Sequence, residues 1–247
     1  MENLKNVIDS FKIQKELYPK IWSEPGDKMN PKVRQNLLEI AYQFIKSFGI
    51  DVVVDDIIVK GSITNYNWSK YSDVDLHIVI DYEQFPSDTK DLYVEFFDLK
   101  KVVFNQRRQL SIFGFDVETY VEGISDEGVS GGIYSILENE WVKKPKKESM
   151  NAQKEDIMKT SKKWMRIIDN LLKHLEGETI DTIKDSVKGI KEKLKKYRQA
   201  GLARGGEMGL ENLVFKVLRR NGYIEKLYDY PIKLMDKQLS LNEKIKN

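Results

Sequence analysis

The sequence contains no cysteine, which excludes disulfide bonds, thiolate metal ligands and cysteine nucleophiles. Histidine is scarce as well, because His77 and His174 are the only 2 in the chain, too few for a histidine-rich zinc site. No apolar run approaches the roughly 20 residues that a membrane-spanning helix needs. The N-terminal MENLKNVIDSFK also lacks the apolar core of a signal peptide. We therefore expect a cytoplasmic protein without a membrane partner, in which oxygen ligands hold any metal.

The net charge of +2 conceals two halves of opposite sign. Residues 1–141 contain 15 Lys and Arg against 24 Asp and Glu, a net charge of −9. Residues 142–247 contain 26 against 15, a net charge of +11. An acidic half suits a cation site and a basic half suits an anionic partner such as RNA, although solvated lysine-rich helices would have the same composition.

The first half mixes helical and strand patterns. The β-branched run VVVDDIIVKGS, from Val52, predicts a strand that enters a tight turn. Asn30-Pro31 is a typical helix start, a capping residue followed by proline. Helices are predicted over 3–19, 31–47 and 88–105, and further strands over 74–80 and 112–122 and in a hairpin from GIYSIL to WVKKP. This order predicts an α/β or α+β sheet domain over residues 1–147.

Beyond the linker-like segment KKPKKESMNAQ only helical patterns follow. Helices are predicted over about 152–175, 179–198, 208–221 and 231–246, with Gly177, Gly201 and Gly222 as terminators. In the third of these helices an apolar stripe is expected to face the core: Leu210, Leu213, Val214, Val217 and Leu218. We expect residues 148–247 to form a basic helical domain.

The stretch GSITNYNWSKYSDVDLHIVI, residues 61–80, carries the clearest chemical pattern. Asp73 and Asp75 are two residues apart at the start of a strand, so their carboxylates point to the same face. Such close like charges repel unless a cation joins them, and two divalent cations about 3.5–4 Å apart can clamp a phosphoryl group. Oxygen ligands of this kind suit Mg²⁺ or Mn²⁺.

Gly61 and Ser62 end the preceding strand and complete the pattern. Glycine lets the backbone approach a phosphate closely, and a serine hydroxyl with exposed N–H groups can hold the phosphates of a nucleoside triphosphate. Lys70 would add a positive charge. Phosphoryl transfer depends chiefly on positioning and charge neutralisation, so no nucleophilic side chain is required.

The pattern VKGS, a spacer of 10 residues and DVDL resembles that of the DNA polymerase β-like nucleotidyltransferase superfamily. Members of that superfamily carry a third acid on a neighbouring strand, and the segment GFDVETYVE offers Asp116 and Glu118. Glu118 is favoured because the apolar Tyr120-Val121 follows it, but Asp116 shares its face and also remains a candidate metal ligand. The segments GIYSIL with WVKKP, and ARGGEMGLENLVFKVLRRNGYIEKL, resemble uncharacterised predicted nucleotidyltransferases of bacteria and their phages.

The resemblance implies an α+β fold, with a nucleotidyltransferase-type mixed β-sheet flanked by helices and an all-helical C-terminal domain after it. It also implies an Mg²⁺-dependent enzyme that moves a nucleoside monophosphate from a triphosphate to an acceptor and releases pyrophosphate. Asp73, Asp75 and Glu118 would be the catalytic metal ligands, and Gly61 and Ser62 would hold the triphosphate. The acceptor could be an RNA end, a nucleotide, a small molecule or a protein.

Several other residues are candidates for the functional site, and each also has a purely structural interpretation. Tyr134 could stack on a base or belong to the core. Lys216, Arg219 and Arg220 could bind a triphosphate or nucleic-acid phosphates, or lie on a solvated helix. His77 is in phase with the aspartates but is more typical of a hydrogen-bonded structural residue. Two other functions also fit: a metal-dependent nuclease or phosphatase, and a degenerate nucleotidyltransferase fold that acts as a binding or antitoxin-like module.

Overall fold

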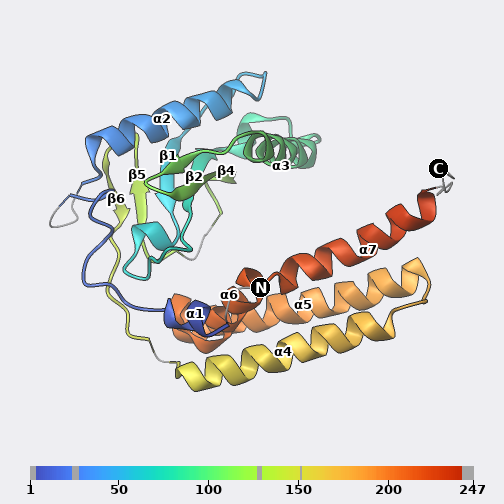
Figure 1. Cartoon of the computed structure of the whole chain (residues 1–247). Helices are drawn as coiled ribbons and strands as arrows, with labels where there is room; N and C mark the ends of the chain where they lie inside the picture. Colours follow the sequence, from blue (N-terminus) through green and yellow to red (C-terminus); the bar gives the residue numbers. More distant parts are fainter. Residues whose placement is uncertain (1–3, 24–27, 127–129, 151, 241–247) are drawn as a thin grey trace, which may run out of the picture. The chain divides into compact units, whose positions relative to one another are not determined.

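The computed structural model describes residues 4–23, 28–126, 130–150 and 152–240. Over these residues the chain is an α+β protein with a six-stranded mixed sheet and seven α-helices, divided into two compact units (Figure 1). The sheet unit is Lys12–Ser149, and the helical unit combines Met1–Phe11 with Met150–Asn247. The first helix, α1 (Leu4–Asp9), therefore groups with the helical unit, whereas the sequence placed it in the sheet domain.

The sheet has the strand order β3–β4–β2–β1–β5–β6. The strands are β1 (Asp56–Lys60), β2 (Val74–Ile80), β3 (Ser111–Ile112), β4 (Phe115–Gly123), β5 (Ile133–Ser135) and β6 (Glu140–Lys143). β2 and β4 run parallel, and the other neighbouring pairs run antiparallel. A parallel pair needs a long crossover, and helix α3 (Lys90–Arg107) lies in the connection between these two strands.

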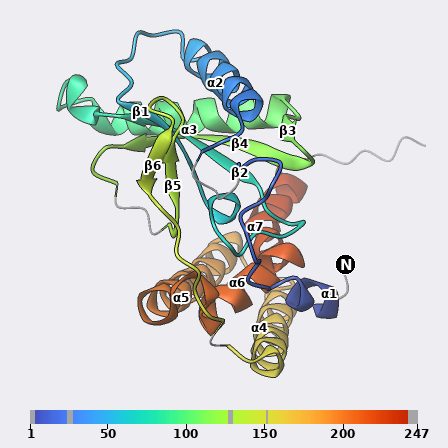
Figure 2. The same cartoon turned by 90° about the vertical axis from the view of Figure 1, so that its left-hand side faces the viewer.

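The two faces of the sheet differ because β2 alternates buried apolar residues with partly exposed ones. Its apolar side chains join a core with the helices α2 (Pro31–Lys46) and α3, which lie next to each other against the sheet (Figures 1 and 2). The core residues from these three elements are Val74, Leu76, Ile78, Ile80, Leu37, Ala41, Phe44, Phe97 and Phe104. Asp75 and His77 therefore belong to the opposite, polar face of the sheet.

Three predicted boundaries in the first half were wrong. The helix predicted over 3–19 ends at Asp9, and Gln14 instead donates hydrogen bonds to the carbonyls of Tyr66 and Trp68. The first strand begins at Asp56 rather than Val52. The strand predicted over 112–122 is present from Phe115 as β4, but its start was wrong, because Phe113 and Gly114 both have positive φ and separate β4 from the short β3.

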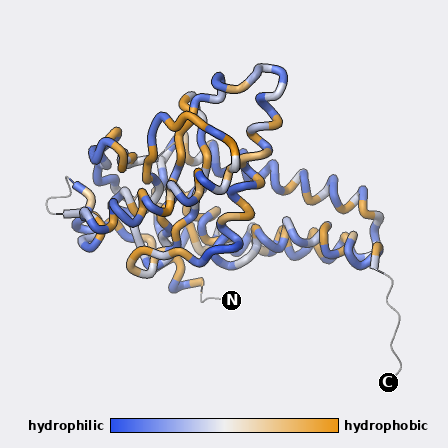
Figure 3. The backbone as a smooth tube through the Cα atoms, turned by 90° about the horizontal axis from the view of Figure 1, so that it is seen from above, coloured by the Kyte–Doolittle hydropathy of each residue, from blue (hydrophilic) through white to orange (hydrophobic). Residues whose placement is uncertain are grey.

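The helical unit is built from α1 and four longer helices: α4 (Lys154–His174), α5 (Ile180–Gly205), α6 (Leu210–Arg220) and α7 (Tyr223–Leu239). Hydrophilic and hydrophobic residues alternate along these helices, as expected when each helix buries one face (Figure 3). In α6 the predicted apolar stripe is confirmed for Leu213, Val214, Val217 and Leu218, which have no exposed surface, whereas Leu210 at the start of the helix is only partly buried. Among the described residues no helix combines the length and hydropathy that crossing a membrane requires.

Two predicted ends in the helical unit were wrong. Gly201 does not terminate α5, which continues to Gly205; a Cβ at Gly201 would lie 2.3 Å from Cβ of Glu211, so this glycine lets α5 and α6 approach closely. Helix α7 begins at Tyr223, directly after Gly222 turns the chain with a φ of 75°, and passes through Pro231. Residues 241–246 of the helix predicted over 231–246 lie outside the described residues.

Candidate metal centre

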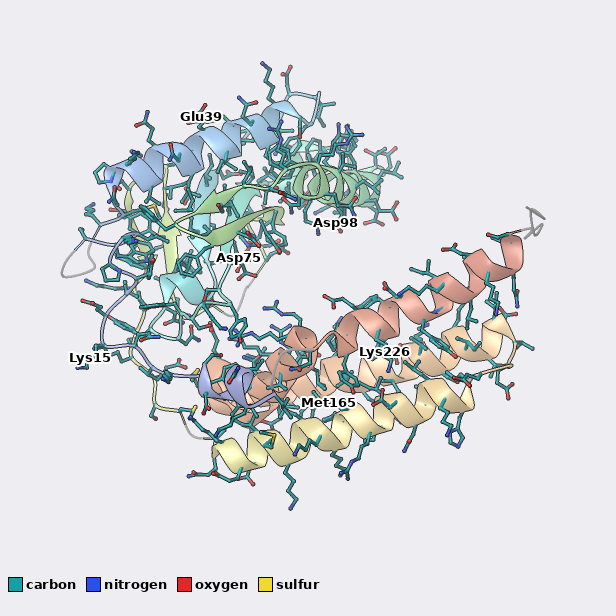
Figure 4. All side chains as sticks on the ribbon, in the orientation of Figure 1. Lys15, Glu39, Asp75, Asp98, Met165 and Lys226 are labelled. Atoms are coloured by element: carbon teal, nitrogen blue, oxygen red, sulfur yellow. The ribbon has the colours of Figure 1, made fainter. Side chains whose placement is uncertain are left out.

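Three carboxylates meet at the start of the two parallel strands. Asp73, Asp75 and Glu118 each present an oxygen atom, and these atoms all lie within 4.8 Å of one another. The strand register explains the cluster, because Asp75 stands directly opposite Glu118 and Asp73 precedes β2 in the same phase. Figure 4 shows Asp75 on the sheet. All three residues keep some exposure, so an ion from solvent could reach them.

Asp116 lies outside this cluster. It is exposed and pairs with Ser111 in the short β3–β4 hairpin, two residues before Glu118 on the same strand face. Of the two acids that the sequence left open, the geometry therefore brings Glu118, and not Asp116, to the aspartate pair.

Gly61 touches Asp75 directly. Its φ of +93° is a conformation that only glycine adopts easily, and a Cβ at this position would lie 2.2 Å from Oδ2 of Asp75. The predicted Gly-Ser turn and the predicted carboxylates are therefore in van der Waals contact. Any side chain at residue 61 would displace the carboxylate.

Hydrogen bonds hold the Gly-Ser turn in place. Ser62 begins a single 3-10 turn, Ser62–Thr64, and its hydroxyl donates to Oγ of Ser72 over 2.7 Å. Oγ of Ser72 also accepts from the N–H of Ser69, at 3.0 Å. From the other side, the N–H of Gly61 donates to Oγ of Ser130 at 3.3 Å.

The loop before β5 completes this support. Thr64 donates to the carbonyl of Gly132 at 2.8 Å, and a Cβ at Gly132 would lie 2.2 Å from the carbonyl oxygen of Thr64. Ser72, Ser130 and Gly132 were not among the residues predicted for the site. The run Ser130-Gly131-Gly132 was the signal that could have indicated a close backbone approach.

A polar network continues along the same sheet face from the third carboxylate. The hydroxyl of Tyr120 donates to Oε2 of Glu118, and burial, helped by this bond and by Asp75, raises the pKa of Tyr120. The Tyr120 ring stacks on His77 with 4.7 Å between ring centroids. His77 therefore borders the cluster through Tyr120 and does not join it.

Beyond His77 the network ends in a half-buried ion pair. Nδ1 of His77 lies 2.8 Å from Oε2 of Glu122, which also pairs with Lys60. Burial lowers the pKa of His77 below its ordinary value despite the opposing effect of Glu122. Burial alone would raise the pKa of Glu122, but the bonds from His77 and Lys60 outweigh it and the pKa is lowered.

No protein-family model, curated protein or solved structure matches the chain. What the site can do chemically must therefore follow from its own residues. Three carboxylate oxygen donors within 4.8 Å of one another are a ligand set that Mg²⁺ and Mn²⁺ prefer, and a divalent cation would remove their mutual repulsion. The residues present thus fit a metal of this class.

The remaining predicted site residues lie elsewhere. Tyr134 is fully buried, where its hydroxyl donates to Asn139 and accepts from the N–H of Met29. A ring without exposed surface cannot stack on a nucleotide base, so this prediction was wrong. Lys70 is exposed, and its ammonium lies 4.7 Å from the centroid of the Tyr71 ring.

Lys216, Arg219 and Arg220 belong to α6 in the helical unit, whereas the carboxylates belong to the sheet unit. Their assignment as triphosphate ligands stays a prediction. Arg220 donates to Oγ of Ser10 and lies over the ring of Phe11, so part of its guanidinium has a structural role.

Proposed function

We propose that the chain is a metal-dependent nucleotidyltransferase that moves a nucleoside monophosphate from a nucleoside triphosphate to an acceptor and releases pyrophosphate. One observation carries this proposal: three carboxylates from neighbouring parallel strands lie within 4.8 Å of one another, beside a glycine turn packed on Asp75. The combination favours phosphoryl transfer because it places a cation site and a glycine turn of the backbone next to each other.

Each residue of the site has a proposed role. Asp73, Asp75 and Glu118 would hold Mg²⁺, which when bound supplies the positive charge that neutralises and aligns the phosphates. The backbone at Gly61 and the hydroxyl of Ser62 would contact the triphosphate, and the hydroxyl would exchange its hydrogen bond to Ser72 for one to a phosphate oxygen. One of the three carboxylates would accept the proton of the attacking hydroxyl. Tyr120 holds Oε2 of Glu118 through its hydroxyl and so restrains the position of this carboxylate.

The test uses triphosphates labelled at the α-phosphate, incubated with Mg²⁺ and with RNA, protein and small-molecule acceptors. We expect Asp73→Asn with Asp75→Asn to lower transfer at least roughly a hundredfold, the loss typical when one electrostatic stabiliser is removed. The fold should persist, because the substitutions relieve repulsion between like charges. Asp116→Asn is the matched control, since it removes a carboxylate from the same strand face as Glu118 but outside the cluster.

The position of the label separates the alternatives. A nucleotidyltransferase leaves the α-phosphate on an acceptor, whereas a nuclease or phosphatase releases nucleotide or phosphate into solution. A binding module would leave the triphosphate intact. Normal turnover by the Asp73 and Asp75 double variant would contradict the proposal, as would an equal loss in Asp116→Asn.

A further inference from the structure

Helix α5 carries a row of cations at alternating spacings of four and three residues. This spacing keeps their side chains on one face of the helix. The row is Lys184, Lys188, Lys191, Lys195 and Arg198. It extends about 21 Å at the helical rise of about 1.5 Å per residue. Of the acids on α5, Asp181 precedes the row in the first turn, and Asp185 and Glu192 lie roughly a quarter turn around the helix.

Contacts show what lies beside this face of α5. The guanidinium of Arg198 lies 4.6 Å from the centroid of the Phe215 ring, and its Nε donates to Asn212 at 3.1 Å, so the row borders α6. The ammonium of Lys191 lies 3.5 Å from the centroid of the exposed Tyr228 ring, so the row also borders α7. On α6 three further cations follow at positions that share a side of the helix: Lys216, Arg219 and Arg220.

Among the described residues, some cations of the helical unit form an ion pair with a carboxylate, and those of the row on α5 do not. Several cations of this unit form ion pairs: Lys154 with Asp9, Arg204 with Glu211, Lys226 with Asp169 and Lys233 with Asp229. In the part of the chain that the structure describes, no carboxylate forms an ion pair with the five cations of the row or with Lys216 and Arg219, and the same holds for Lys193 and Lys196 on another side of α5. The row is distinguished by its positions, which are all cationic, whereas a solvated surface usually intersperses both signs.

Charge repulsion affects the pKa values of two of these cations, Lys216 and Arg198. Burial lowers the pKa of Lys216, and Arg220, Arg219 and Arg198 lower it further against the opposing effect of Glu207. Burial, with Arg219, also lowers the pKa of Arg198. The cations therefore repel one another in the free protein, and an anion that binds here would relieve that repulsion.

We propose that the row on α5 and the three cations of α6 bind the phosphate backbone of a single-stranded nucleic acid. A small anion would need only a few converging cations, whereas a row of cations about 21 Å long suits an extended strand of nucleic acid. The exposed side chain of Tyr228, which lies beside Lys191 of the row, offers a ring on which an unpaired base can stack. Binding of the nucleic acid does not need the carboxylate cluster. That the row holds a nucleic-acid acceptor during transfer rests on the proposed function.

The test measures binding of a fluorescent single-stranded RNA to the full chain by anisotropy, without triphosphate, over a range of salt concentrations. Lys188→Ala with Lys195→Ala should weaken binding and reduce the slope of log K against log salt by about 1.4, at about 0.7 per lost phosphate contact. The matched control is Lys193→Ala with Lys196→Ala. It removes the same charge from exposed positions of the same helix that lie off the row, and it should leave the slope nearly unchanged.

Three results would overturn the proposal: no binding of the strand at low salt, equal effects of the two lysine pairs, or a preference for duplex over single strand. Equal binding of DNA and RNA strands would support contacts to the phosphate backbone. The Asp73→Asn and Asp75→Asn variant should bind RNA like the wild type. Loss of transfer with retained RNA binding would therefore be attributable to the carboxylates, and failure of RNA binding alone would leave the proposed chemistry standing.

Discussion

Replacing Gly61 by alanine introduces two costs that the structure allows to be separated. The first is conformational, because a φ of +93° costs an L-residue about 1–2 kcal/mol. The second is steric, since the new Cβ would lie 2.2 Å from Oδ2 of Asp75 and one of the two groups would have to move. Overpacking of this kind typically costs about 1–3 kcal/mol. We expect Gly61→Ala to lower the free energy of unfolding by roughly 2–5 kcal/mol.

Gly114→Ala is the matched control. Gly114 lies in the same unit with a φ of +88°, but nothing would come within 4 Å of its Cβ, so only the conformational cost of about 1–2 kcal/mol applies. Urea unfolding followed by tryptophan fluorescence would compare the two variants. It reports mainly on the sheet unit, which holds three of the 4 tryptophans: Trp22, Trp68 and Trp141.

A double-mutant cycle with Asp75→Ala tests the contact itself. Without the carboxylate, Gly61→Ala should cost no more than Gly114→Ala, which gives a coupling of about 1–3 kcal/mol. Because Asp75 must move in Gly61→Ala, affinity for Mn²⁺ should also fall at least about tenfold, by the loss of one positioned ligand. Equal costs for Gly61→Ala and Gly114→Ala, with zero coupling and unchanged Mn²⁺ affinity, would refute the packing of the turn on the carboxylate.

Two further outcomes are expected. Gly201→Ala should destabilise the helical unit, because its Cβ would lie 2.3 Å from Cβ of Glu211. The control is Gly189→Ala on the same helix, whose Cβ meets nothing within 4 Å and which should stabilise the unit by about 0.5–1 kcal/mol. Comparing the thermal unfolding of the two variants therefore isolates the effect of the close packing between α5 and α6. Because burial lowers the pKa of His77 below 6.5, the unfolded chain takes up the proton more readily, and the free energy of unfolding should fall as pH drops below 6.5. In His77→Gln this pH dependence should be weaker; an unchanged slope in urea titrations between pH 8 and 5 would contradict it.

Local patterns predicted the parts of the fold that depend on neighbours in sequence. Asn30-Pro31 starts α2 as expected, and the side chain of Asn30 accepts from the N–H of Lys32. The alternation over residues 74–80 gave β2 within its observed bounds, and with it the shared face of Asp73 and Asp75. These features follow from capping and from the two-residue repeat of a strand, which act within a few residues.

Features set by distant contacts could not be predicted in this way. Tyr134 looks like an aromatic of a surface hairpin, but its hydroxyl has partners at Met29 and Asn139, and its ring is edge-on to Trp22. The last helix was predicted to begin at residue 231, yet α7 begins at Tyr223, and the buried Leu227 shows that its first turns already pack against the core. In both cases tertiary packing outweighed the local signal.

The third carboxylate shows how a distant residue completes a locally predicted site. β3 pairs only with the first two residues of β4, so the rest of β4 is a strand edge whose N–H and C=O groups need partners. Asn105 of α3 supplies them for Thr119: it accepts from the N–H and donates to the carbonyl of that residue, each at 3.0 Å.

The hydrogen bonds from Asn105 hold Thr119, the residue next to Glu118. They therefore help to fix the register of β4, which decides which acid faces Asp75. A slip of one residue would turn Glu118 to the apolar face, and a slip of two would bring Asp116 opposite Asp75 in its place. Thr119 is fully buried, and its hydroxyl also bonds to Asn105 at 2.8 Å, so either slip would leave buried polar groups without these bonds. The choice between two acids that the sequence left open is therefore made by an asparagine on α3, a residue that no pattern around the acids themselves indicates.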